Sequence, residues 1–221
     1  MQKFDTPTPI SAVLDIPAGR VQLIAGERAD TTVEVLPADA TKSRDVKVAE
    51  QTKVEYSGGV LRIEASAKNQ ILGPSGSIEV TVQLPAGSQV EVKAASAEFR
   101  AVGRFGDVAY DGAHGAIKVD EAASVRLTTQ AGDVSIGRLN GPAEISTAKG
   151  DIRIDEAVRG RVVLRTQLGD VSVGAASGVS ASLDAGTTLG RIHNSLRNAD
   201  GTADLSIHAT TAKGDIVARG L

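Results

Sequence analysis

The sequence contains no cysteine and no tryptophan, and only two tyrosines, three phenylalanines and one methionine among its 221 residues. Without cysteine, disulfide bonds and thiolate metal sites are excluded. With so few aromatic rings, the interior must be thin and filled by Val, Ile, Leu and Ala, side chains that suit the half-buried surface of a β-sheet. The composition therefore predicts an all-β chain.

Basic runs and long apolar runs are also missing. The formal net charge is −3 and the isoelectric point is about 5.7, whereas nucleic-acid binding normally requires a basic patch. No stretch approaches the length of about 18 apolar residues that suggests a membrane span, and the first residues contain no apolar signal-peptide core. We expect no nucleic-acid partner, no membrane insertion and a cytoplasmic location, with association with the cell surface as an alternative.

Glycine, by contrast, is abundant, and it marks an internal repeat. The hexapeptide TAKGDI occurs at 147–152 and again at 211–216, with looser copies at 129–134, 166–171 and 187–192. From Gly132 onward the repeat glycines are 18, 19, 21 and 24 residues apart. The glycine column comprises Gly106, Gly132, Gly150, Gly169, Gly190 and Gly214.

Two polar columns accompany the glycines. The residue after each glycine is aspartate, with Arg191 as the exception, and the residue three before it is threonine from the second copy onward. The aspartates are Asp107, Asp133, Asp151, Asp170 and Asp215. The threonines are Thr129, Thr147, Thr166, Thr187 and Thr211.

The repeat predicts the architecture. Apolar residues lie two and four positions after most of the glycines, a spacing that places both side chains on one face of a strand. A period of about 18–24 residues is too short for a helix, a strand and two loops, but it fits one coil of a two-sided β-solenoid whose coils stack strand on strand. We expect Val134, Ile152 and Val171 to form one interior file.

The N-terminal part alternates less regularly. We expect one elongated β domain over 1–221, with a less regular β region at 1–95 and the repeat solenoid at 96–221. Pro37 and Pro85 are expected at strand ends, where a missing N–H is tolerated. The segments 38–45 and 67–76 are predicted to be exposed loops.

The sequence resembles a bacterial family of β-strand-repeat proteins known as putative adhesins, whose function is unknown. The resemblance is carried by DIPAGRV at 15–21, VTVQLPAG at 80–87 and the later G-D-[VI]-x-[VI] units, and it covers nearly the whole chain. It implies a β-repeat fold, and it supplies no catalytic residues.

The three polar columns have structural interpretations. Glycine is suited to a corner that needs positive φ or a close backbone approach, aspartate can accept hydrogen bonds from turn backbone, and the threonines are predicted to form an internal ladder. Alternatively, the aspartate column could collect a hard cation such as Ca²⁺. The structural interpretation is favoured, and cation binding by the aspartate column is the alternative.

Catalytic motifs are scarce. The three histidines are dispersed without metal-ligand spacing, and no G-x-S-x-G elbow or phosphate-binding loop occurs. We predict that the protein is not an enzyme and needs no cofactor. The predicted function is a β-repeat scaffold or interaction module that binds a protein partner or a second copy through the solenoid ends. A polysaccharide- or cation-binding surface protein is the alternative, and a solenoid-type hydrolase is third.

The C-terminal segment KGDIVARGL stops directly after a repeat strand. We therefore expect the last coil to lie at an open end, where its unpaired strand edge can pair with a second copy or with a strand of a partner. Alternatively, the loop at 196–204 covers that end.

Overall fold

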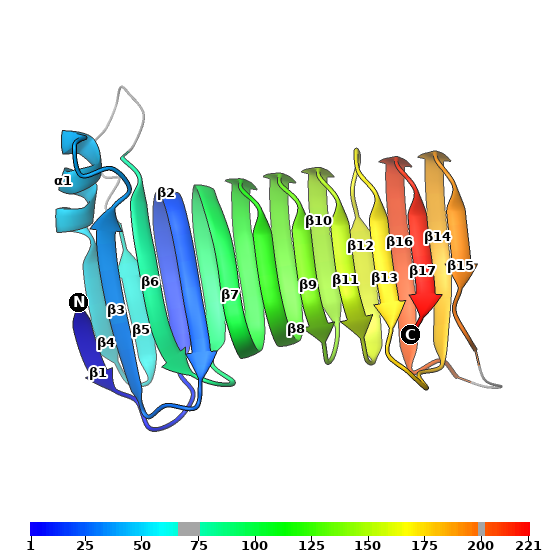
Figure 1. The fold of residues 1–221 in the computed structure, drawn as a ribbon, viewed down its shortest axis with the longest axis horizontal. Coiled ribbons are helices and arrows are strands. Elements are labelled where there is room, and N and C mark those ends of the chain that lie inside the picture. Colours follow the sequence, from blue (N-terminus) through cyan, green and yellow to red (C-terminus); the bar gives the residue numbers. More distant parts are fainter. Residues whose placement is uncertain (66–75, 199–201) are drawn as a thin grey trace. The chain divides into compact units, whose positions relative to one another are not determined.

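The structure, a computed structural model, describes residues 1–65, 76–198 and 202–221. Figure 1 shows that these residues form strands with a single helix among them, which confirms the all-β prediction. The chain divides into two compact units, Met1–Gly115 and Ala116–Leu221. One elongated domain over 1–221 stays a prediction.

The first unit combines parallel and antiparallel pairing. Its strands are β1 (Gln2–Asp5), β2 (Ser11–Gly26), β3 (Asp30–Pro37), β4 (Lys53–Ser57), β5 (Val60–Glu64), β6 (Ile78–Pro85) and β7 (Gln89–His114). The first half of β2 lies between β5 and the start of β7, and its second half lies between β6 and a later part of β7. β2 therefore contributes to two groups of strands. Pro37 and Pro85 end β3 and β6, as predicted.

One helix, α1 (Ser43–Gln51), corrects the end of the predicted loop at 38–45: residues 38–42 form a loop, and residues 43–45 are helical. Val48 is buried, and the carboxylate of Asp45, also buried, accepts a hydrogen bond of 2.9 Å from the Ser77 backbone N–H. A nine-residue helix is marginal on its own, so these tertiary contacts, which a local pattern does not reveal, stabilise it. The predicted loop at 67–76 lies outside the described residues except for Gly76.

The second unit contains the repeat. Its strands are β8 (Ile117–Ala131), β9 (Val134–Leu139), β10 (Ala143–Lys149), β11 (Ile152–Ala157), β12 (Gly160–Arg165), β13 (Val171–Ala175), β14 (Ala181–Leu189), β15 (Ile192–Ser195), β16 (Leu205–Lys213) and β17 (Ile216–Gly220). Each pair of strands joined by a Gly–Asp or Gly–Arg corner is called a rung. In chain order, rung I is 125–131 with β9, rung II is β10–β11, rung III is β12–β13, rung IV is β14–β15 and rung V is β16–β17.

The rungs stack by parallel pairing. Val134 pairs with Ile152, Ile152 with Val171, and Val171 with Ile216. All four side chains are no more than 1% exposed, because alternate residues of each strand point into the space between the two sides of the stack. The predicted interior file and the two-sided solenoid are confirmed.

The last two rungs are not stacked in sequence order. β16 lies between β12 and β14, and β17 lies between β13 and β15. The spatial order is therefore I, II, III, V, IV, which can be followed in Figure 1 from the yellow strands through the red to the orange ones. The expectation that the C-terminal coil ends the stack is wrong: rung V is buried inside it, and rung IV provides the edge.

Candidate functional site

The corner between the two strands of a rung shows why glycine recurs. Gly150 has φ +142°, and a Cβ atom added to it would lie 2.2 Å from the carbonyl oxygen of Gly132 in the neighbouring rung. No side chain fits at that distance, and the backbone conformation itself is rarely adopted by other residues. Stacking at strand spacing therefore requires glycine at this corner.

Gly106, the first member of the predicted glycine column, lies in the first unit, and the members from Gly132 onward lie in the second. The backbone N–H of Gly106 donates to the Ser88 carbonyl at 2.9 Å. Val134 pairs with Ile117, which no Gly–Asp pair precedes. That Gly106 and Asp107 share the corner columns of Gly132 and Asp133 stays a prediction.

The threonines of the repeat point inward and hydrogen-bond along the stack. Thr166 Oγ1 donates to the Gly150 carbonyl at 3.0 Å, and Thr211 Oγ1 donates to the Gly169 carbonyl at the same distance. Thr187 Oγ1 continues the series to the Gly214 carbonyl at 3.0 Å. Thr147 Oγ1 bonds instead within its own rung, to the Lys149 carbonyl. Thr129, Thr147, Thr166 and Thr211 are buried, so an internal ladder is the interpretation that this geometry supports.

The aspartates form a second ladder on the outside of the corner. Oδ1 of Asp133 accepts the backbone N–H of Asp151 at 2.9 Å, and Oδ1 of Asp151 accepts that of Asp170 at 2.8 Å. The next step, from the Asp215 N–H to Asp170 Oδ1, measures 2.7 Å. Each carboxylate thus binds an N–H of the following rung, and a charged acceptor makes such a bond strong.

These carboxylates are spread along the stack. Among the residues that the structure describes, no group of three or more His, Asp or Glu side chains is arranged to hold a metal ion. Backbone hydrogen bonding uses one oxygen of Asp133, Asp151 and Asp170 in turn. We propose that their role is to lock the corners together.

The exception in the aspartate column occurs where the stack ends. Arg191 belongs to rung IV, and its backbone N–H donates to Asp215 Oδ1 at 2.8 Å. Its guanidinium also lies 3.1 Å from Asp215 Oδ2. The backbone N–H of Arg191, and after it the guanidinium, hold the pKa of Asp215 below its usual value. An aspartate at 191 would find no further rung to bind among the described residues, whereas arginine neutralises the last carboxylate.

Rung IV leaves an open edge. β14 pairs with β16 and β15 pairs with β17, and no other described strand pairs with either of them. Ile192 is 45% exposed, whereas its equivalents Ile216 and Val171 in the inner rungs are buried. Leu189 is 65% exposed. The segment after β15 covers only the start of β14: the Ala181 N–H donates to the Arg197 carbonyl at 3.0 Å. Within the predicted cover at 196–204, residues 199–201 lie outside the described residues.

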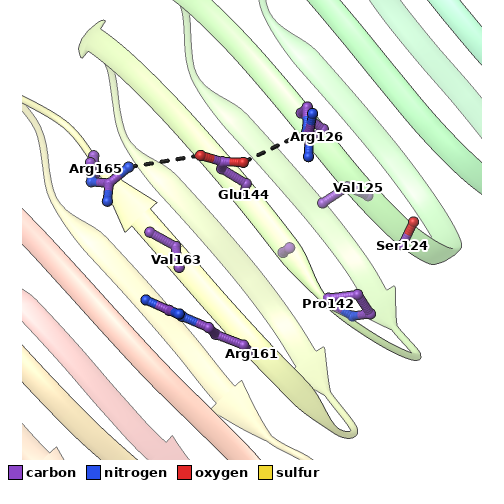
Figure 2. Close-up of a pocket in the computed structure, with 9 residues that line it drawn as sticks. Ser124, Val125, Arg126, Pro142, Glu144, Arg161, Val163 and Arg165 are labelled. Atoms are coloured by element: carbon purple, nitrogen blue, oxygen red, sulfur yellow. Dashed lines mark ion pairs between the residues drawn. The ribbon is translucent and has the colours of Figure 1, made fainter.

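Two side-chain groups were not anticipated from the sequence. His208 Nδ1 lies 2.9 Å from Asp184 Oδ2, because β16 lies beside β14. On the same face, Arg126, Arg161 and Arg165 surround a shallow depression that also includes Glu144 and Val163 (Figure 2). Only the register between strands brings these residues together, since no short motif contains them.

A family model matches residues 13–219, almost the whole chain. The chain belongs to the Toastrack DUF4097 family. Solved structures similar to it include a putative adhesin from Bacteroides fragilis, with 12% identity, a TM-score of 0.53, and coverage of 98% of this chain and 95% of that one. A putative adhesin from Parabacteroides distasonis has 12% identity, a TM-score of 0.46 and the same two coverages. No protein of curated function matches the chain.

Membership of the Toastrack family establishes the fold, and the resemblance stated from the sequence is confirmed. The similarity to the Bacteroides structure adds fold-level support alone, because its sequence identity is low. Among the described residues, no helix is both long enough and apolar enough to cross a membrane.

Proposed function

We propose that the protein is a non-enzymatic interaction module that self-associates through the edge of rung IV. The observation that carries this proposal is the unpaired side of β14, a nine-residue strand at the end of the stack in the described part of the chain. Natural proteins commonly protect such edges with lysine, proline, a bulge or a short strand. Neither β14 nor β15 contains lysine or proline, and β14 pairs with β16 in continuous register from Ala181 to Thr187.

The edge is complementary to a second copy of itself. If two β14 strands pair antiparallel about a two-fold axis through Ala185, Leu183 lies opposite Thr187, and Ala181 keeps its bond to Arg197 outside the paired segment. Asp184 then faces Gly186 of the second copy, so no like charges oppose each other. Such a pairing is closed, because both copies use the same surface. It would also reduce the exposure of Leu189.

The direction of the backbone N–H groups in β14 allows its open edge to be blocked without disrupting its pairing with β16. The Ala181 N–H points away from β16, toward Arg197, and Ala185 has the same parity in the strand. Its N–H is therefore directed to the open side, where proline is tolerated in an edge strand. Ala185→Pro removes a donor needed by the second copy and preserves the pairing with β16.

Concentration-dependent mass by light scattering tests this proposal. The unmodified protein is expected to shift from monomer to dimer as its concentration rises. Ala185→Pro is expected to weaken the dimer at least about tenfold, since it removes an interface hydrogen bond and obstructs close approach. Ala185→Ser, which retains the N–H, serves as the matched control. A monomer at every accessible concentration, or a dimer unchanged in Ala185→Pro, would contradict self-association through β14.

A further inference from the structure

The depression shown in Figure 2 concentrates positive charge on a protein whose net charge is −3. The side chains of Arg126, Arg161 and Arg165, here called the arginine cluster, all line it and are exposed. Arg126 belongs to β8, whereas Arg161 and Arg165 belong to β12, and β10 lies between these two strands. Glu144 is the one acidic side chain that lines the depression, so the group has an excess of two positive charges.

Internal ion pairing leaves the arginine cluster available. Arg126 Nε lies 3.6 Å from Glu144 Oε2, and Arg165 Nη1 lies 3.9 Å from Glu144 Oε1. Both are long and exposed, and ion pairs of this kind contribute little. The side chain of Arg161 makes no ion pair or hydrogen bond with any described residue. Each guanidinium has five N–H donors, so one shared carboxylate satisfies few of them.

One outward-facing side chain in the depression is apolar, which is unusual for the outer face of a sheet. Val162 and Leu164 point into the interior, so Val163 points outward, yet it is only 9% exposed. Pro142, which directly precedes β10, also lines the depression. In the rows of the sheet, Val163 occurs between Glu144 and His208, two polar residues. An apolar side chain framed by guanidinium groups fits a ligand with both carbon-bound surface and negative charge.

The surroundings favour an extended ligand. In the next rung, Ser206 stands beside Arg161 and Thr210 stands beside Arg165, and neither side chain is large enough to form a wall. The cationic groups lie on β8 and β12, which are separated by β10 and so by about 9.6 Å, and a small anion cannot contact them all at once. A chain carrying several anions can, and its contacts then reinforce each other.

We infer that the arginine cluster binds an acidic polysaccharide, with carboxylates on the guanidinium groups and a sugar face on Val163 and Pro142. Arginine recognises carboxylates through paired N–H donors. The inference is independent of the edge of β14, since the depression involves β8, β10 and β12 and none of the edge strands.

Binding of polygalacturonate, measured by calorimetry at low salt, tests the inference. The triple variant Arg126→Gln, Arg161→Gln, Arg165→Gln is expected to lose at least about 30-fold in affinity, because each charged hydrogen bond contributes substantially. The matched control is Arg138→Gln, Arg153→Gln, Arg219→Gln, which removes the same charge from β9, β11 and β17. This control is expected to bind polygalacturonate with an affinity within about threefold of that of the unmodified protein, because the electrostatic effect of distant exposed charges is weak.

Four further arms separate the possible ligands. Neutral dextran is expected not to bind, and both galacturonate monomer and inorganic phosphate are expected to bind at least about 100-fold more weakly than the polymer. Circular dichroism and thermal unfolding of both triple variants check that the fold is retained. No binding of polygalacturonate, equal losses in the two triple variants, or monomer binding as tight as polymer binding would overturn the inference. Binding to vesicles of acidic phospholipid in preference to the polymer would overturn it as well.

Discussion

Replacing Gly150 with valine is expected to destabilise the second unit by roughly 3–5 kcal/mol, the upper range for single substitutions. Two effects combine. The φ of +142° is strained for a branched side chain, and the new Cβ would meet the Gly132 carbonyl oxygen at 2.2 Å. That oxygen belongs to backbone held in the adjacent rung, so it cannot move away without separating rungs I and II. Urea denaturation followed by circular dichroism measures the loss.

Two control substitutions test whether the large loss of stability is specific to Gly150. Gly186→Ala is expected to change stability by less than about 1 kcal/mol, because nothing lies within 4 Å of its added Cβ. Asp151→Asn should have a similarly small effect, since an amide oxygen can still accept the Asp170 N–H. If Asp151→Asn cost as much as Gly150→Val, the aspartate column would have a role beyond accepting these hydrogen bonds.

The second large effect concerns position within the stack. Ile152→Ala is expected to cost roughly 2–5 kcal/mol, because it removes three carbons from a fully buried site. Ile192 occupies the same column in rung IV, through pairing with Ile216, but its side chain is 45% exposed. Ile192→Ala is therefore expected to cost less than about 1 kcal/mol in the monomer. Both variants replace isoleucine with alanine, so the two sites are compared for the burial of the same side chain.

Chemical denaturation at low protein concentration gives both values. If Ile192→Ala cost as much as Ile152→Ala under those conditions, rung IV would be covered on its outer side. The stack would then not end at β14 and β15, and the proposed edge would be absent.

The sequence predicts the contents of a rung well because local physical requirements recur in each one. Glycine and threonine, as at Gly150 and Thr166, recur because every corner packs against the backbone of a neighbouring rung. An aliphatic residue, as at Val171, recurs because every strand faces the same interior. Parity along a strand then determines which side chains point inward. These requirements depend on a few adjacent residues, so a pattern within the sequence reveals them.

The order of the rungs is different, because near-identical rungs can pair with each other in several orders. Thr166 and Thr187 belong to similar corners, and the residues around them in the sequence do not indicate that rung V lies between rungs III and IV. One signal was present: Arg191 replaces aspartate at the only corner in the repeat that has no described rung beyond it. The arginine cluster was missed for the same reason, since it depends on the register between strands.

Two engineered cysteine pairs distinguish insertion of the carboxyl-terminal rung between rungs III and IV from stacking of the rungs in sequence order. The chain has no native cysteine, and Arg161 pairs with Ser206, which in turn pairs with Ser182. Adjacent strands lie about 4.8 Å apart, within the range that a disulfide spans, whereas strands two apart lie about 9.6 Å apart. Oxidation should therefore consume both thiols within a monomer in Arg161→Cys with Ser206→Cys and leave them free in Arg161→Cys with Ser182→Cys, as read by thiol titration and intact mass. Efficient closure of the second pair, with the first remaining reduced, would mean that the rungs stack in sequence order and would contradict the architecture described above.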